Sequence, residues 1–376
     1  MTSEEKLYTL ALTQLGYISP DILLLLLQET GNGKELFDMR NNLDELLPDC
    51  SERLKSIIDA DWSNALKTAE GEMAFCDANG IDILCHGENG YPQRLNDCSD
   101  APAVLYYKGT ADLNCKHVVN VVGTRHCTSY GADTVNRFIS DLSLLCPNTL
   151  IVSGLAYGID INAHIQALDK GFDTVAVVAH GLDTIYPSSH RNTAVRMTSQ
   201  GGLLSEYMSG TKIERHNFVR RNRIVAGMSD ACLIVESAAR GGGLITARIA
   251  QDYGREVFAV PGRLGDKYSE GCNQLIHDSR AALFTSAEDL VTAMGWQCDA
   301  ELEKAKARGI ELSLFQELTD DQRRIADALR KCGDLQLNQL MVKTGFTIAK
   351  VNQLLFEMEM EGVVRPMAGG NYHLIQ

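Results

Sequence analysis

The stretch 118–125, VVNVVGTR, joins a short apolar run to a glycine and two polar residues. A buried strand that leads directly into a loop has this pattern. Comparable apolar runs recur later in the chain, with stretches of helical period between them: Leu150–Val152, Thr174–Ala179, Ala231–Val235 and Glu256–Val260. Apolar strands that alternate with helices predict an α/β fold, a doubly wound parallel sheet covered on both faces.

The carboxyl ends of these strands carry glycine or polar residues. They are Gly123, Ser153-Gly154, His180-Gly181, Glu236-Ser237 and Pro261-Gly262. A doubly wound sheet binds its ligands in the crevice at the carboxyl ends of its strands. We therefore expect the functional site at this edge.

A helical region precedes the sheet. Residues 1–80 contain short helical stretches, and we assign them to a helical domain ahead of the sheet domain at 81–296. The break TGNG at 30–33 fits either a phosphate contact of the helix-hairpin-helix kind or a structural turn. The excess of acidic residues in this region favours a structural or protein-contact role.

The end of the chain has the pattern of a winged helix. A polar linker at 297–311 precedes residues 312–376, in which three helices, at 319–331, 337–344 and 347–361, come before a hairpin. In a winged helix the third helix normally enters a DNA groove, but here Lys350 is its only basic residue, beside three glutamates. The charge favours a protein-contact or weakly DNA-binding role.

Composition indicates an intracellular protein. The eleven cysteines are scattered without CxxC or Cys/His metal spacing, and the N-terminus lacks a basic region followed by an apolar run. We expect reduced thiols in the cytoplasm. The longest aliphatic run, Ile22–Leu27, is far below the roughly 18 residues of a membrane span, so no membrane segment is expected.

The segment 211–228, TKIERHNFVRRNRIVAGM, concentrates positive charge in a chain whose formal net charge is −14. Phe218 stands among its cations, which outnumber the single acid Glu214: Lys212, Arg215, Arg220, Arg221 and Arg223. A single-stranded nucleic acid needs cations for its phosphates and flat apolar partners for its unstacked bases. A solvated helix start paired with the acidic remainder is the alternative. Together with the strand-end loops, the segment favours nucleic acid.

The first strand-end loop, Gly123-Thr124-Arg125, precedes a helix expected to begin near 128–130. The N-terminus of that helix favours a phosphate, and Arg125 adds a bidentate donor. A structural ion pair of Arg125 is the alternative. The dinucleotide fingerprint GxGxxG is absent, since Arg125 occupies the position of its second glycine.

The second loop contains Ser153, Gly154, Gly158 and Asp160, with His164 four residues later. We reject a catalytic triad of Ser153, Asp160 and His164. The acid and the histidine share one helix face, and the serine lacks a GxSxG nucleophile elbow. We expect these residues to hold the turn, while the two glycines allow close approach of the backbone.

The third loop has three consecutive glycines, Gly241, Gly242 and Gly243, before a helix. Such a loop can present several N–H groups to an anion. It is not a Walker A loop because the GKS/T ending is missing, so ATP hydrolysis is not supported.

The central region resembles the DNA-processing protein A (DprA/Smf) family over most of its length. The family's motifs occur in order between Val121 and Ile276: VVGTRHCTSYG, SGLAYGIDINAH, GLDTIYP, LLSEY, FVRRNRIVAGMSD, GGGLITARIA, REVFAVPG and SEGCNQLI. The flanks are similar too, because the family commonly carries an N-terminal helical domain of the sterile-alpha-motif (SAM) kind and a C-terminal winged helix.

The resemblance implies an extended Rossmann fold that binds single-stranded DNA and acts as a homodimer. It also implies protection of incoming strands and loading of RecA recombinase onto them during natural transformation and recombination. It implies no catalytic activity, no cofactor and no metal. The alternative is a Rossmann-type nucleotide-processing enzyme of the phosphoribohydrolase kind, but its proline-glycine-glycine loop is missing, since Pro261-Gly262 is followed by Arg263.

The resemblance also assigns roles to single residues. Arg125 would grip phosphate in a pocket that takes a base, Phe218 would stack on a base and Arg215 would contact the strand. The full set expected to bind DNA is Gly123, Thr124, Arg125, Arg215, Phe218, Arg221, Asn222, Arg223, Gly241, Gly242 and Gly243.

This chain departs from the family's pattern at three places. Val219 stands where proline is usual, and Tyr157 replaces a common arginine. Arg240-Gly241-Gly242 replaces a serine-glycine-serine, which puts the role of that loop in doubt.

Overall fold

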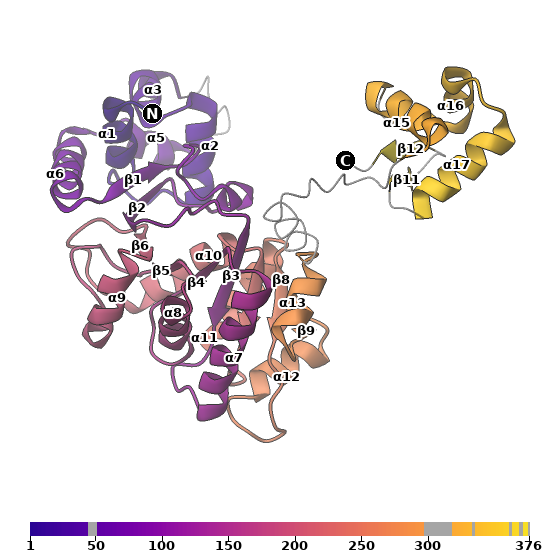
Figure 1. Cartoon of the computed structure of the whole chain (residues 1–376). Coiled ribbons are helices and arrows are strands. Elements are labelled where there is room, and N and C mark those ends of the chain that lie inside the picture. Colours follow the sequence, from indigo (N-terminus) through magenta and orange to yellow (C-terminus); the bar gives the residue numbers. More distant parts are fainter. Residues whose placement is uncertain (44–50, 297–317, 333–334, 361–362, 368–370, 375–376) are drawn as a thin grey trace. The chain divides into compact units, whose positions relative to one another are not determined.

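The computed structural model describes residues 1–43, 51–296, 318–332, 335–360, 363–367 and 371–374. The chain forms two compact units, Met1–Gln297 and Cys298–Gln376 (Figure 1). The predicted linker at 297–311 lies outside the described residues, and the boundary predicted at residue 80 stays a prediction. Within the described residues, none of the helices is both long and apolar enough to cross a membrane.

The first unit is built on a nine-stranded sheet with the order β1-β2-β6-β5-β4-β3-β7-β8-β9 (Figure 1). Its strands are β1 (Asp82–Cys85), β2 (Val104–Gly109), β3 (His117–Val122), β4 (Thr149–Ser153), β5 (Thr174–Val177), β6 (Gly201–Ser205), β7 (Ala231–Ile234), β8 (Glu256–Ala259) and β9 (Ala282–Leu283). From β6 to β9 all neighbours pair in parallel, whereas β1 and β2 are antiparallel additions. The predicted doubly wound parallel sheet is confirmed.

Successive apolar side chains of the strands point to opposite faces of the sheet, and helices cover both faces. Val119 and Val121 of β3 pack with α7 (Ser129–Leu145), α8 (Ile159–Asp169) and α13 (Ala287–Ala293). Val118 and Val122 face the opposite layer, formed by α10 (Arg215–Gly227), α11 (Gly242–Asp252) and α12 (Glu270–His277). Helix α9 (Arg191–Met197) packs in a smaller cluster near β5 and β6.

The N-terminal helices share a core with the antiparallel end of this sheet (Figure 1). They are α1 (Ser3–Leu12), α2 (Pro20–Thr30), α3 (Gly33–Met39), α5 (Glu52–Ile58) and α6 (Ser63–Asn79). Their buried leucines cluster with Val104 and Tyr106 of β2. The buried Glu72 of α6 also accepts hydrogen bonds from the backbone N–H of Ser209 (2.8 Å) and from its hydroxyl. The loop after β6 is thus fastened to the N-terminal helices.

Both edges of the sheet are short or covered. At one edge, β9 has two residues. At the other edge, the ammonium group of Lys6 on α1 donates a hydrogen bond of 2.8 Å to the carbonyl of Ile83 in β1.

The second unit is a winged helix. Three helices, α15 (Asp320–Cys332), α16 (Leu337–Thr344) and α17 (Ile348–Met360), pack on a three-stranded sheet with the order β10-β12-β11. Its strands are β10 (Leu335–Gln336), β11 (Val364–Met367) and β12 (Asn371–Leu374). The core contains Ile325, Leu340 and Leu355, one from each helix. The predicted order of three helices followed by a hairpin is confirmed.

Candidate nucleic-acid interface

A pocket of about 110 Å³ opens at the carboxyl ends of β3 and β4, between α10 and α11. Its lining includes Gly123, Arg125, Gly154, Asp160, Phe218, Arg221, Asn222, Gly242, Gly243 and Thr246. After β3 the chain adds β4, β5 and β6 on one side of it, and β7 then pairs with its other side. The direction of the sheet order therefore reverses at β3. This is the place where open α/β sheets bind ligands. Most of the residues singled out from the sequence meet here.

Arg125 and Phe218 form the mouth of this pocket. The Arg125 guanidinium lies over the Phe218 ring, with 5.6 Å between its central carbon and the ring centroid. On another side the Tyr186 ring meets Phe218 edge-on, with centroids 5.7 Å apart. Arg125 is exposed, and Tyr186 keeps 45% of its surface exposed. A cation and two aromatic rings are therefore presented together to solvent.

The N-terminus of α11 forms the opposite wall. Gly241 is its N-cap, and within the part of the chain that the structure describes no side chain caps this end. Gly242 has open space where a Cβ would stand, and a Cβ at Gly243 would stand 3.5 Å from the Gly123 Cα, an ordinary contact distance. The first turn of α11 is thus free to offer backbone N–H groups to an anion at the pocket.

The N-terminus of α7, in contrast, has a carboxylate beside it, and the phosphate contact expected there stays a prediction. The helix begins at Ser129, close to the predicted position, with Thr128 as its N-cap. The buried Glu236 carboxylate accepts hydrogen bonds from the Thr128 N–H (3.0 Å) and hydroxyl (2.5 Å). A carboxylate near a helix N-terminus already supplies negative charge where the helix favours it. The sequence shows Glu236 as an acid that follows β7, but no local pattern predicts its contact with Thr128.

The second loop is held by close backbone contacts. Gly158 has φ +80°, and a Cβ there would lie 2.2 Å from the Thr124 carbonyl oxygen, so glycine is required. The Ser153 hydroxyl donates to the Val121 carbonyl at 2.6 Å, and the Asp160 carboxylate accepts from the Ala156 N–H at 3.3 Å. These contacts fix the loops after β3 and β4 against each other.

Arg221 lies beneath the pocket rather than at its mouth. Its side chain is buried, and its Nη1 donates to the carbonyls of Gly154 (2.7 Å) and Val177. Burial lowers the pKa of Arg221 and raises the pKa of Asp160, and the attraction between the two charges opposes both shifts. Gly154 is squeezed beside this pair, because a Cβ there would lie 2.5 Å from the guanidinium. Arg221 thus ties α10 to the ends of β4 and β5.

Arg223 is also committed to the protein. Its Nη2 donates to the Glu206 carboxylate, and its Nε lies 3.8 Å from Asp100. It does not line the pocket at β3 and β4, whereas Asn222 does and accepts a hydrogen bond from Arg221 Nε at 3.4 Å. The sequence prediction grouped Arg221 and Arg223 with the exposed cations, and the structure places them apart.

Arg215 and Lys212 remain on the surface at the start of α10. Glu214, the single acid of this segment, lies 3.2 Å from the exposed His216. Cations at this end can thus reach a strand that leaves the pocket mouth.

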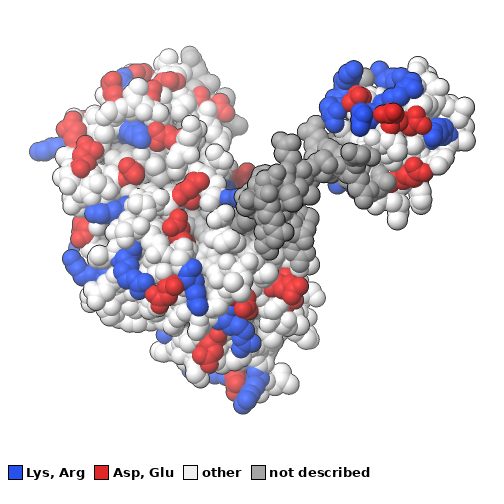
Figure 2. Space-filling view, viewed as in Figure 1, with Lys and Arg blue, Asp and Glu red and all other residues white. Residues whose placement is uncertain are grey.

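Three cations of the winged helix have acidic neighbours. Lys350 of α17 lies 3.0 Å from Asp321, and two ion pairs of α15 join Arg323 to Asp320 and Arg330 to Asp327. Figure 2 shows basic and acidic side chains side by side on the visible face of this unit.

Comparison with known proteins gives matches to both units. The sequence model of the family described as DNA recombination-mediator protein A matches residues 82–295, and that of the DprA winged helix domain matches residues 315–370. The DNA processing protein DprA of Streptococcus pneumoniae is 41% identical over 201 residues, which are 54% of this chain and 70% of that protein.

Two solved structures resemble the fold at moderate sequence identity. The X-ray structure of DprA from Streptococcus pneumoniae has a TM-score of 0.64 at 32% identity, covering 75% of this chain and 95% of that one. A DNA processing protein A from Helicobacter pylori, whose description concerns its single-stranded DNA binding mode, has a TM-score of 0.52 at 29% identity. It covers 57% of this chain and 95% of its own.

Proposed function

Since this chain belongs to the DNA recombination-mediator protein A family, we propose that it binds single-stranded DNA at the pocket between α10 and α11. The observation that carries the proposal is the group formed by Arg125, Phe218 and Tyr186 at the pocket mouth. An aromatic ring stacks on any exposed base, and the guanidinium beside it attracts the adjoining phosphate.

The pocket accounts for both parts of a nucleotide. Gly242 and Gly243 at the N-terminus of α11 supply N–H donors for a phosphate, and Phe218 supplies the apolar face for a base. Arg215, one turn before Phe218 on α10, extends the positive surface along the strand. Gly123 and Thr124 then act through the backbone that positions Arg125.

The pocket favours a single strand over a duplex. In a duplex the bases are stacked and paired, so a ring at the mouth of a small pocket reaches no base face without unstacking. Sequence preference should be weak, because every base has a face on which to stack.

We propose that the strand is bound in the cytoplasm by a homodimer that loads RecA recombinase onto it. Family membership and the resemblance of the motifs support this further step. Its test is RecA filament assembly on DNA coated with single-strand-binding protein, with and without this chain, alongside the mass of the chain in solution. A monomer, or no faster filament assembly, would contradict this step without touching strand binding.

The binding test compares oligothymidylate with a matching duplex across a salt series. We expect much tighter binding of the single strand, with log affinity falling by roughly 0.7 per phosphate contact for each unit of log salt. Equal affinity for both forms at moderate salt would rule out the proposal. A nucleoside monophosphate release assay on the same protein tests the phosphoribohydrolase alternative.

A further inference from the structure

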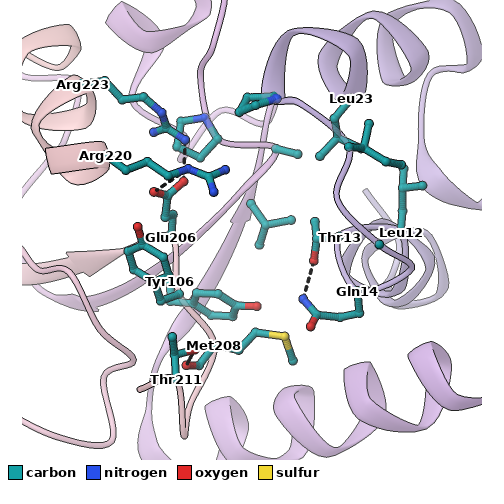
Figure 3. A pocket seen from close by; sticks show the side chains of 17 residues that line it. Leu12, Thr13, Gln14, Leu23, Tyr106, Glu206, Met208, Thr211, Arg220 and Arg223 are labelled. Atoms are coloured by element: carbon teal, nitrogen blue, oxygen red, sulfur yellow. Dashed lines mark hydrogen bonds and ion pairs between the residues drawn. The ribbon is translucent and has the colours of Figure 1, made fainter. Parts of the chain in front are cut away.

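A second cavity, of about 230 Å³, lies on the other side of α10 (Figure 3). The N-terminal helices form one wall with apolar and small polar residues such as Leu12, Thr13 and Leu23, and the loop after β6 forms another with Met208 and Thr211. Arg220 and Arg223 enter from α10, and the Glu206 carboxylate forms ion pairs with both. None of these residues lines the pocket between α10 and α11.

Two buried polar atoms at this cavity have no hydrogen-bond partner among the described residues. Nη1 of Arg223 is a donor without an acceptor, and Oε1 of Glu206 has only an ion pair with Arg220 Nε at 3.8 Å. The side chains of Arg223 and Glu206 are 7% and 8% exposed. Leaving such groups without a hydrogen bond is unfavourable, so the pair is suited to a ligand that offers one acceptor and one donor.

Charge and shape narrow the ligand class. The two arginines are balanced by Glu206 and by Asp100, which lies 3.8 Å from Arg223 Nε, so the cluster does not call for an anion. The opposite wall is largely apolar. A flat, uncharged group with a donor next to an acceptor fits both walls. The Watson–Crick edge of every nucleobase has this pattern, and only an unpaired strand exposes it.

The position on α10 connects the cavity to the strand. Val219 and Asn222, three residues apart, line the pocket at β3 and β4, whereas Arg220 and Arg223, again three apart, line the second cavity. Residues spaced by three share a helix face, so the two sites occupy neighbouring faces of one helix that is about 10–12 Å wide. A strand that crosses α10 passes both sites.

We propose that this cavity is a second base subsite, in which Arg223 and Glu206 hold the Watson–Crick edge of a nucleotide further along the strand. The proposal rests on the proposed strand binding. Glu72 gives the subsite a fixed rim, because its bonds to Ser209 hold the loop that carries Met208 and Thr211. The N-terminal helices thereby become part of the DNA site rather than a separate module.

The test fills the cavity without changing its charged residues. Gln14 is exposed at the cavity's edge, and Gln14→Trp places a large ring there, while Gln28→Trp, at an exposed position of α2 away from the cavity, is the matched control. Affinity is measured for oligothymidylates of about 4 and about 16 nucleotides, the range of site sizes for single-strand binders. Thermal unfolding of both variants checks that the fold is intact.

We expect Gln14→Trp to lose about tenfold in affinity for the long strand and to keep the affinity for the short one, with Gln28→Trp unchanged for both. Unchanged affinity of Gln14→Trp for the long strand, or equal losses for both lengths, would overturn the second subsite. If the unaltered protein binds neither length, the strand-binding proposal itself is wrong, which is a different result.

Discussion

Arg125 and Arg221 both line the pocket between α10 and α11, yet their surroundings are opposite. Arg125 stands in solvent over the Phe218 ring. Arg221 is buried, and its donors are used by the carbonyls of Gly154 and Val177. An exposed guanidinium such as that of Arg125 can exchange bound water for a phosphate. A buried guanidinium such as that of Arg221 stabilises the fold that positions Arg125. A run of arginines in a sequence therefore does not measure how many phosphates a protein grips.

The largest expected effect is a loss of stability when the buried Arg221 is replaced. Arg221→Ala removes three hydrogen bonds and the positive charge that acts most strongly on the buried Asp160, and removing one member of a buried pair typically costs about 3–5 kcal/mol. Urea unfolding measures this loss. The control Arg220→Ala, on the same helix but 41% exposed, should cost less than about 1 kcal/mol. Equal unfolding free energies of the two variants would contradict the structural role assigned to the buried Arg221.

Replacement of the exposed Arg125 should change the affinity for single-stranded DNA rather than the stability. Arg125→Ala should weaken single-strand binding strongly and flatten the slope of log affinity against log salt by roughly 0.7, the value for one phosphate contact. The unfolding free energy should stay nearly unchanged, because Arg125 is exposed. A loss of stability like that of Arg221→Ala would show that Arg125 is structural.

Phe218→Ala should weaken binding by about 1–3 kcal/mol, the usual contribution of one base stack. Because no charge is removed, the salt slope should remain that of the unaltered protein. Salt titrations of the two variants side by side separate the roles. A slope that falls equally in Arg125→Ala and Phe218→Ala would contradict the division into phosphate and base contacts.

A smaller effect concerns pH. Burial, reinforced by the nearby Arg221, lowers the pKa of His164 from 6.5 to about 3, so its ring is neutral in the folded protein. Between these values the unfolded chain binds the extra proton, and stability therefore falls as the pH falls, by up to about 1.4 kcal/mol per pH unit. Urea unfolding at successive pH values should show a weaker acid dependence for His164→Gln. An identical dependence in the variant would mean that other groups carry it.

The smallest effect should come from removing the winged helix. Three of its cations already face acids, as Lys350 faces Asp321, so a chain that ends at Gln297 should keep its single-strand affinity within about tenfold. Affinity of the shortened chain for oligothymidylate checks this. A larger loss from a folded shortened chain would place DNA contacts in the second unit despite its paired charges.

Local pattern was enough to predict the parallel sheet. The apolar runs beginning at Val118, Leu150, Thr174, Ala231 and Glu256 correspond to β3, β4, β5, β7 and β8, because strands buried on both faces need uninterrupted apolar side chains. β6 was harder to predict as a strand, since it begins with Gly201-Gly202. Gly202 packs against the Tyr107 ring of β2, a contact between distant parts of the chain that no local pattern contains.

The burial of Arg221 had a signal in the sequence. The buried residues Asn217, Arg221, Ile224, Val225 and Met228 are spaced as one face of a helix, so the position of Arg221 belongs to the stripe that faces the core. The charge of the side chain masked this pattern. Tyr186 beside Phe218 and Glu236 at Thr128 had no such signal, because each contact joins segments that are far apart along the chain.

The two edges of the large sheet affect the tendency of the protein to aggregate at high concentration. An uncovered edge strand is a template onto which a second chain can add a strand, which is a common route to aggregation. Here β9 offers only two residues, and Lys6 occupies a carbonyl of β1 with a charged group. The architecture therefore restrains growth by strand addition and leaves any assembly of copies to side-chain surfaces.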